Sequence, residues 1–338
     1  MSKRERAVTL REVAEAAGVS VATASRACSK PQLVTPETRE LVAAAIDRLG
    51  YRPNVIAQDL KRASTGVVLV VVPSLSPYFL DIFRGVEAAA AELGYTALVG
   101  HSDRRGDREV AFVDRVRSRR ADGVILATSV DSGGLHLGRP PMPPVVVALD
   151  ECGAGYLPSV SVDHEAAAFA ATSHLLALGH RRIAHIAGAA GSSMSEHRLQ
   201  GFRRALAAAG TPLDPELLFQ GDFTVEAGER AMERFLMIPH RPTAVFAAND
   251  EMALGALRAC RRAGLKAPRD LSIVGFDDQR IAALTEPSLT TVGVPTLALG
   301  RQAMLQLGRI LAGEAVQQKL VLPTKLTLRA STGPPPSA

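Results

Sequence analysis

The chain has 338 residues, which predicts two or three domains, and its 47% hydrophobic and 22% charged residues exclude a largely disordered protein. It begins without a signal-peptide core and has no run of roughly 18 apolar residues, so we expect a cytoplasmic protein with no membrane partner. The cysteines Cys28, Cys152 and Cys260 are far apart and give no sign of a disulfide framework or a zinc site.

Most of the net charge of +5 lies at one end of the chain. Residues 1–62 contain eleven Lys or Arg and seven Asp or Glu, a net charge of +4, which leaves +1 for the other 276 residues. A basic surplus in a short N-terminal segment points to a polyanion partner for that segment, although a solvated basic face is the alternative.

Two short helices joined by a tight turn are predicted within residues 9–28, TLREVAEAAGVSVATASRAC. Thr9 begins the first helix and forms a capping box with Glu12. Gly18 permits the turn, and Ser20 caps the second helix. This is the spacing of a helix-turn-helix, in which the start of the second helix meets base edges in the major groove of DNA.

The DNA-facing residues of this second helix would be Val21 and Ala22, with Arg26 one turn further on. A third helix is predicted over residues 35–49, with Gly50 as its stop. The buried face of this helix is predicted to contain Leu41, Val42, Ala45, Ile46 and Leu49. A helical bundle without a nucleic-acid role is the alternative interpretation of the three helices.

Residues 51–65, YRPNVIAQDLKRAST, can form a short helix over 54–61 that is too short to be stable alone in water. With this hinge segment included, about sixty residues resemble the DNA-binding headpiece and hinge of the lactose and galactose repressor family of bacterial transcriptional regulators. The resemblance implies a helix-turn-helix DNA-binding domain at 1–52, followed by a hinge helix and linker at 53–65.

The resemblance also implies a mode of DNA recognition. In the family, the hinge helices of two subunits pair and insert a leucine into the minor groove, and Leu60 stands at that position. Val21 and Ala22 would make apolar major-groove contacts, and Arg26 the strongest hydrogen-bonded base contact. The other DNA-binding residues that the resemblance implies are Thr9, Ser20, Thr23, Ser25, Asn54, Ala57, Lys61 and Arg62.

A second architecture begins at Gly66. The run GVVLVVVP is typical of a strand buried on both faces of a parallel sheet. Strands are expected at 66–73, 95–100, 122–128, 145–150, 181–188, 217–220, 243–248 and 271–276, helices at 78–93, 108–119, 164–178, 196–209, 225–236 and 250–263, and a loop at 131–144. Two successive α/β units of this kind predict two similar lobes with a ligand crevice at the carboxyl ends of the strands.

The common catalytic motifs are missing from this region. The turn after the first strand, PSLSPYF, lacks GxGxxG, and the chain contains no GxxxxGK[ST], HExxH or GxSxG. His164 and Glu165 are adjacent, without a second histidine at helical spacing. We therefore expect no enzyme activity, no catalytic residues, no metal and no cofactor.

The family resemblance extends over this region through GHRRIAHIAG, HRLQGF, TAVFAANDEMALGAL and LSIVGFDD, which are similar to the two-lobed, periplasmic-binding-protein-like core that binds effectors. The effector contacts that it implies are Asp150, Arg198, Asn249 and Asp277, with Phe79 packed on a ring face. Carboxylates, an amide and an arginine together can satisfy several ligand hydroxyls. For Asp250 and Asp278 we prefer a solvated or capping role.

The resemblance further implies an effector-binding and dimerisation domain at 66–330. Its N-lobe is expected at about 66–160 plus 294–318 and its C-lobe at about 161–290 plus 320–330, followed by a disordered tail at 331–338. The proline-rich end of the chain excludes a C-terminal helix for tetramers, so we expect a homodimer on palindromic double-stranded DNA, packed around 66–93 and 278–290.

The expected effector is a small sugar or nucleoside. HRLQGF and GDFTVEAGERAM resemble the cytidine- and ribose-responsive branch, which favours a ribose-containing nucleoside or a pentose. Ser76 and His164 depart from the family pattern near the expected site; His164 is interpreted as a structural histidine, with pH-sensitive binding as the alternative. The competing functions are a solute-binding protein without a regulatory role and a sugar- or nucleoside-acting enzyme.

Overall fold

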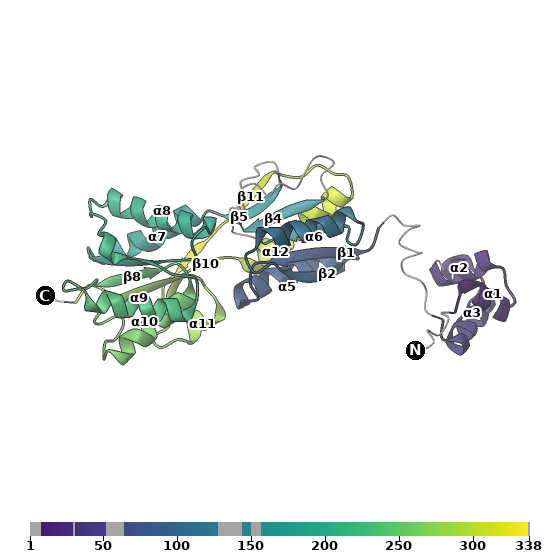
Figure 1. Ribbon diagram of the computed structural model, residues 1–338, viewed down its shortest axis with the longest axis horizontal. Coiled ribbons are helices and arrows are strands. Elements are labelled where there is room, and N and C mark those ends of the chain that lie inside the picture. Colours follow the sequence, from purple (N-terminus) through teal and green to yellow (C-terminus); the bar gives the residue numbers. More distant parts are fainter. Residues whose placement is uncertain (1–7, 30, 52–63, 128–143, 150–156, 337–338) are drawn as a thin grey trace. The chain divides into compact units, whose positions relative to one another are not determined.

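The computed structural model describes residues 8–29, 31–51, 64–127, 144–149 and 157–336 (Figure 1). The chain divides into two compact units, residues 1–65 and 66–338, and each is described by itself. The predicted site residues Asn54, Ala57, Leu60, Lys61, Arg62 and Asp150, the whole hinge helix predicted at 54–61 and most of the loop at 131–144 lie outside the described residues.

The first unit is a bundle of α1 (Leu10–Ala16), α2 (Val21–Ser29) and α3 (Pro36–Leu49), with a 3-10 turn at Pro31–Leu33. The predicted capping box forms, since the Thr9 backbone N–H donates to Glu12 Oε2 at 2.7 Å and the Glu12 N–H donates to Thr9 Oγ1 at 3.4 Å. Gly18 and Gly50 both adopt left-handed backbone, with φ of 66° and 62°. The predicted helix-turn-helix and third helix are confirmed.

The core of this unit is small. Val13 on α1 packs against Val42 and Ala45 on α3, and Val19 from the turn fills the space beside them. The prediction that Leu41 is buried was wrong, because its side chain is 56% exposed. Leu41 precedes Val42 by one residue, about 100° around the helix, and so points away from the face that meets α1.

The N-lobe is built on a parallel sheet of six described strands in the order β11-β5-β4-β3-β1-β2. Its strands are β1 (Val67–Val72), β2 (Thr96–His101), β3 (Gly123–Leu126), β4 (Val145–Leu149), β5 (Ser159–Val162) and β11 (Lys319–Leu322), and its helices are α5 (Pro77–Glu92), α6 (Gly106–Arg117) and α12 (Thr296–Leu311). Val68 and Val70 of β1 lie in the core beneath α5 and α12, whereas Leu69 and Val71 pack towards α6. Burial on both faces explains the continuous apolar run in the sequence.

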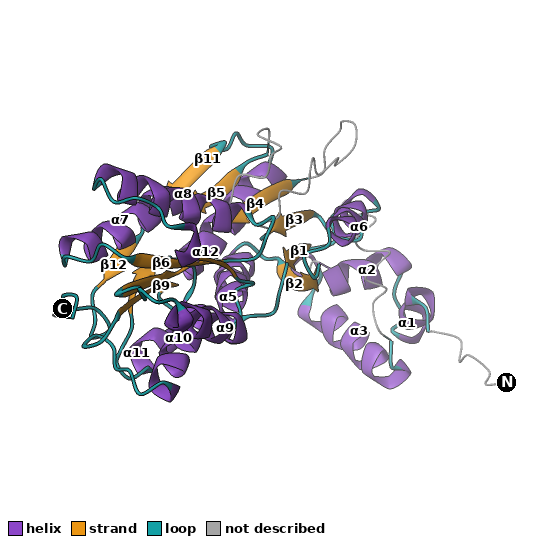
Figure 2. Cartoon of the chain, turned by 60° about the vertical axis from the view of Figure 1, so that its left-hand side comes forward, coloured by secondary structure: helices purple, strands orange, loops and turns teal. Residues whose placement is uncertain are grey.

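The C-lobe repeats this plan with a sheet in the order β12-β10-β9-β8-β6-β7, in which only the β12 pairing is antiparallel. Its strands are β6 (Ile183–Ala187), β7 (Leu218–Gln220), β8 (Ala244–Ala247), β9 (Ser272–Asp277), β10 (Thr290–Gly293) and β12 (Lys325–Thr327), and its helices are α7 (His164–Ala177), α8 (Ser193–Ala208), α9 (Val225–Met237), α10 (Asp250–Arg262) and α11 (Arg280–Leu284). A 3-10 turn at Pro215–Leu217 precedes β7. Helices α7 and α8 cover one face of the sheet, and α9 and α10 cover the other. Figure 2 shows the sheet between these two pairs of helices.

The chain passes between the lobes three times, after β5, after β10 and after β11. The predicted second boundary agrees with the structure, but the first and the third require a correction. Residues 161–162 and 320–322 belong to the N-lobe, because β11 pairs with β5 in a register that places Leu320 opposite Val160 and Leu322 opposite Val162. The chain therefore returns to the C-lobe only at β12.

The predicted disorder of the tail was wrong for residues 331–336. Ser331 is buried, and its hydroxyl donates to the carbonyl oxygen of Ile273 at 2.6 Å and accepts from the Thr290 N–H at 2.8 Å. The carbonyl of Gly333 is 2.9 Å from Nε2 of His180. These bonds anchor the tail to the C-lobe sheet, and the prolines that follow have no N–H that would need a partner.

Glycines allow several neighbouring helices to approach each other closely. A Cβ added at Gly300 of α12 would overlap the carbonyl oxygen of Ile82 on α5, and one at Gly85 would overlap that of Leu297. Gly228 and Gly255 stand in the same relation between α9 and α10. The backbones themselves are in contact at these crossings, so no side chain fits between them.

Candidate functional site

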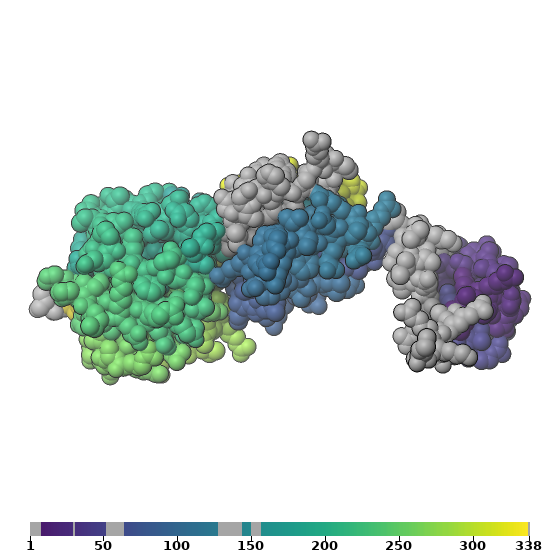
Figure 3. All heavy atoms as spheres, in the orientation of Figure 1, coloured from purple at the N-terminus to yellow at the C-terminus, as the bar shows by residue number. Residues whose placement is uncertain are grey.

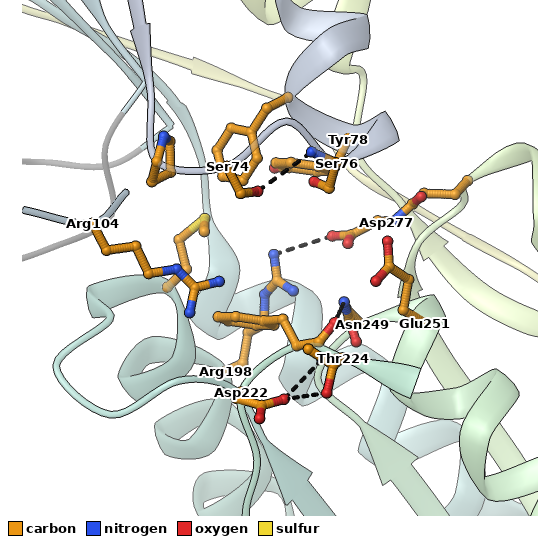
Figure 4. Close-up of a pocket in the computed structure, with 15 residues that line it drawn as sticks. Ser74, Ser76, Tyr78, Arg104, Arg198, Asp222, Thr224, Asn249, Glu251 and Asp277 are labelled. Atoms are coloured by element: carbon orange, nitrogen blue, oxygen red, sulfur yellow. Dashed lines mark hydrogen bonds and ion pairs between the residues drawn. The ribbon is translucent and has the colours of Figure 1, made fainter. Parts of the chain in front are cut away.

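A cavity of about 240 Å³ lies between the lobes, at the carboxyl ends of the strands (Figure 4). It is lined from the N-lobe by Pro73, Ser74, Ser76, Tyr78, Phe79 and Arg104, and from the C-lobe by Met194, Arg198, Asp222, Phe223, Thr224, Asn249, Glu251, Asp277 and Gln279. The structure thus brings together four of the five residues assigned to effector binding, Phe79, Arg198, Asn249 and Asp277. That they contact a ligand stays a prediction.

Arg198 forms the polar floor of the cavity. Its side chain is 1% exposed, and Nη2 forms an ion pair with Oδ1 of Asp277 at 3.2 Å. Nη1 donates to the carbonyl oxygen of Ala248, and Cζ lies 3.8 Å from the centroid of the Phe276 ring. A buried guanidinium with these partners is held in one orientation, as ligand recognition requires.

Asp277 combines an ion pair with an unfavourable site for a negative charge. Burial raises the pKa of its carboxyl to about 6, although the adjacent Arg198 opposes this shift. Its backbone has φ of 110°, which is rare for a residue with a side chain. Such backbone at the end of a strand is typical of functional sites, where the surrounding fold maintains it.

Asn249 makes two hydrogen bonds that shape the C-lobe wall, one of them to Phe223. Asn249 precedes α10, and its Oδ1 accepts from the Met252 N–H at 2.9 Å, so it caps the helix. Its Nδ2 donates to the carbonyl oxygen of Phe223 at 3.0 Å. Both bonds leave one further donor and one acceptor site of the amide for a ligand.

His164 lies behind Arg198. Its Nε2 is 3.4 Å from the carbonyl oxygen of Leu149, and Nε of Arg198 donates to its Nδ1 at 3.5 Å. Burial, together with the nearby guanidinium, lowers the pKa of this imidazole well below its usual value. A neutral ring that donates through Nε2 and accepts through Nδ1 satisfies both contacts, which is a structural role.

Sequence reasoning missed a contact that spans the two lobes. Cζ of Arg104, from the loop after β2, lies 5.7 Å from the centroid of Phe223. Both residues have left-handed backbone, with φ of 55° and 71°, and neither is a glycine. No motif in the sequence signals such a pairing, because it depends on how the two lobes face each other.

Glu251 was also missed. It lies in the first turn of α10, and Figure 4 shows its carboxylate beside that of Asp277. Its side chain is partly buried, and burial raises its pKa. Glu251 lies two positions after Asn249 in the stretch TAVFAANDEMALGAL. Its place in the first turn of a predicted helix was the sequence signal that could have identified it.

Asp250 and Asp278 have structural partners and do not line the cavity. Asp250 is buried and accepts hydrogen bonds from Thr291 Oγ1 at 2.6 Å and from the Gln279 N–H at 2.7 Å. Asp278 forms an ion pair with Arg329 at 2.6 Å. The preference for a role outside the ligand set agrees with these contacts, but Asp250 is not solvated.

The residues predicted to read DNA lie on α2 in the first unit, and that they contact bases stays a prediction. Val21, Ala22 and Arg26 are exposed, and Ser25 is partly exposed on the same side of the helix. Val21 is 48% exposed although it is apolar. Ser20 and Thr9 are exposed at the two helix starts, and Thr23 is held by Ser20, whose Oγ accepts from the Thr23 N–H at 3.1 Å.

Within the residues described, no helix is long and apolar enough to cross a membrane, and no cluster of three or more His, Cys, Asp or Glu is arranged to hold a metal ion.

Two family models match the chain: "Bacterial regulatory proteins, lacI family" at residues 9–54 and "Periplasmic binding protein-like domain" at residues 172–332. The HTH-type transcriptional repressor CytR of Escherichia coli is 39% identical over 333 residues, which cover 98% of each chain. Similar solved structures include the complex of the transcriptional regulator CelR with cellobiose (TM-score 0.72, 35% identity, 96% of this chain and 99% of that one). The lac repressor dimer bound to operator and the anti-inducer ONPF has a TM-score of 0.87 at 29% identity, covering 97% of this chain and 100% of that one. The chain therefore belongs to the lacI family of bacterial regulatory proteins.

Proposed function

We propose that this DNA-binding transcriptional repressor is controlled by a ribose-containing nucleoside or a pentose that binds in the cavity between its lobes. The observation that carries the proposal is the fixed polar set on the cavity floor, the Arg198–Asp277 pair with Asn249 beside it. These groups offer donors and acceptors to ligand hydroxyls, while Phe79 and Phe223 supply apolar ring faces for the sugar or base.

A thermal-shift screen tests the effector class. A ligand that binds only the native protein stabilises it by mass action and therefore raises Tm. At a ligand concentration of 100 times Kd, the free energy of unfolding increases by about 2.7 kcal/mol. Cytidine, uridine, adenosine and ribose are expected to raise Tm, with cellobiose as the comparison. An increase with hexoses or disaccharides alone would contradict the proposed class.

The pH dependence of effector binding follows from Asp277, whose pKa is raised to about 6. If the ionised carboxylate accepts a ligand hydroxyl, affinity is constant above this pH and falls as Asp277 is protonated, by about tenfold at pH 5. Titration calorimetry at pH 7.5, 6 and 5 with the effector from the screen measures this loss. In Asp277→Asn the affinity should be lower and independent of pH, and a flat profile in the wild type would refute the acceptor role.

Operator recognition is assigned to Val21, Ala22 and Arg26. Arg26→Ala is expected to relax base preference at one position of each half-site, at a cost of about 1–3 kcal/mol for the specific sequence. Selection of duplexes from a randomised pool by wild type and variant measures this change. A variant that selects the same sequence with equal stringency would contradict the assignment.

The homodimer is supported by exposed apolar side chains on both lobes. Leu98 and Val99 on the outer strand β2 are 48% and 46% exposed, and Leu284 on α11 of the C-lobe is 68% exposed. All three fall within or next to the segments assigned to dimer packing. Pairing there would create the two-fold axis that a palindromic operator requires.

We further infer that the effector changes the angle between the lobes and thereby shifts the hinge helix between folded and disordered states. A coupling of about 1–3 kcal/mol would change operator affinity 5- to 150-fold. The hinge itself, with Leu60 as the minor-groove wedge, remains a prediction from sequence.

The remaining assignments follow from this role: action in the cytoplasm, where the DNA is, and no enzyme activity. A solute-binding protein would respond to ligand without any operator, and an enzyme would convert the ligand during incubation. Operator selection and analysis of the recovered ligand therefore separate the three functions.

A further inference from the structure

The chain enters the N-lobe from residues 1–65 at the amino-terminal ends of the sheet strands, which is the side of the sheet opposite the cavity. Residue 66 enters β1 there, and the turn between α6 and β3 is fixed beside it. The Gly66 N–H donates to Oδ2 of Asp122 at 2.8 Å, and the Asp122 N–H donates to the carbonyl oxygen of Val67 at 2.8 Å. The turn and the entry point of the chain are therefore a single local structure.

This turn is strongly basic. The exposed arginines are Arg115 and Arg117 at the end of α6 and Arg119 and Arg120 in the turn itself. Arg117 is neutralised by an ion pair of 2.8 Å with Asp114, and the carboxylate of Asp122 accepts from Gly66. Within the described part of the chain, Arg119 and Arg120 form no ion pair. Figure 3 shows the atoms of α6, in blue, on the visible surface of the N-lobe.

Arg119 also has an unusual backbone. It follows α6 with φ of 53°, and the Arg120 N–H closes the turn by donating to the carbonyl oxygen of Arg115 at 2.9 Å. After α3, α5, α7, α8, α10 and α12, the left-handed residue is instead a glycine: Gly50, Gly94, Gly179, Gly210, Gly264 and Gly313. Glycine adopts this conformation without the strain that a Cβ causes. The fold thus gives no reason for arginine here, and a local conflict of this kind is typical of a functional position.

We propose that Arg119 and Arg120 form an accessory surface for the DNA backbone, which contacts phosphates flanking the bases read by α2. The inference rests on the operator binding assigned above. DNA is the favoured partner because the helix-turn-helix is joined covalently to this same edge, and because guanidinium groups suit phosphate oxygens. In a dimer the surface would occur twice and lengthen the protected segment on both sides.

Two variants separate a phosphate contact from a structural role. Arg119→Gly removes the charge and relieves the strain, so Tm is expected to stay equal or to rise, while Arg119→Lys keeps the charge. Arg261→Gln, at an exposed arginine at the end of α10, removes the same charge from the C-lobe and serves as the control.

Binding is measured by fluorescence anisotropy over a salt series, on an operator selected by the wild type, with and without about ten flanking base pairs on each side. Arg119→Gly/Arg120→Gln is expected to weaken binding to the flanked duplex roughly tenfold or more. It should also flatten the salt slope by about 0.9 for each phosphate that the variant no longer neutralises. Binding to the unflanked duplex, and binding by Arg261→Gln, should be nearly unchanged.

An unchanged affinity and salt slope would overturn the proposed DNA contact. An acidic protein would then be the favoured partner of the two arginines. Equal losses on both duplexes would place the defect in the headpiece and also overturn it. Failure of the wild type to select any operator would instead refute the regulatory function itself.

Discussion

Arg198→Ala is expected to abolish the response to effector while leaving operator binding intact. The guanidinium is the central cation of the cavity floor, and it holds Asp277 at 3.2 Å and the carbonyl of Ala248. Without it, the proposed effector would lose the main donor of the cavity floor, and Asp277 is left as a buried carboxyl without a cation. Operator affinity with and without effector, measured by anisotropy, should become identical in the variant.

Loss of stability must be separated from loss of the site in this experiment. Removing one member of a buried ion pair costs about 3–5 kcal/mol, so Arg198→Ala should also melt at a lower temperature. Arg198→Met/Asp277→Asn removes the stranded charge and should recover stability without recovering the response. Arg204→Ala is the matched control on α8, because Arg204 forms an exposed ion pair with Glu165 at 2.6 Å and should leave the response unchanged. A normal response in Arg198→Ala would refute the site.

Gly300→Ala is expected to cause the largest loss of stability among conservative substitutions in the N-lobe. The added methyl group would overlap the backbone carbonyl of Ile82, and backbone cannot rotate away as a side chain can. Separating α12 from α5 opens the core between them, at a cost of about 3 kcal/mol. Thermal and urea unfolding would report a lower midpoint.

The same helix offers a control of the opposite sign. At Gly308 an added Cβ would meet only the end of the flexible Leu93 side chain. Gly308→Ala should be neutral or stabilising by about 0.5–1 kcal/mol, since alanine favours helix over glycine. Equal midpoints for the two variants would contradict the close helix crossing.

The features that could be predicted from the sequence are those encoded locally. The capping box of Thr9 and Glu12 and the turns at Gly18 and Gly50 fix the headpiece within a few residues of chain. The alternation of apolar runs and helical segments gave eight strands and six helices of the core close to their observed bounds. Asn249 and Asp277 were identified through motifs that place them at strand ends.

Several of the missed features depend on contacts that are distant in sequence. β11 joins the N-lobe through pairing with β5, and Ser331 is ordered by Ile273. No local pattern at either segment specifies its partner. The Arg104–Phe223 contact requires both lobes at once. Leu41 was misplaced because its apolar side chain fits the helical pattern, although none of the described helices of this small bundle covers it.

The three passages of the chain between the lobes constrain how the protein can be made. β11 is the last strand of the N-lobe sheet, and α12 covers one face of that sheet. The strands that are synthesised first therefore lack these partners until residues 296–322 have been made. The C-lobe needs β12 and the tail at Ser331. On the ribosome, therefore, the headpiece can fold early, whereas neither lobe is complete until nearly the whole chain has emerged. A truncation shortly before residue 319 would leave both lobes with an exposed sheet edge. The product is expected to aggregate rather than to fold into a shorter effector-binding protein.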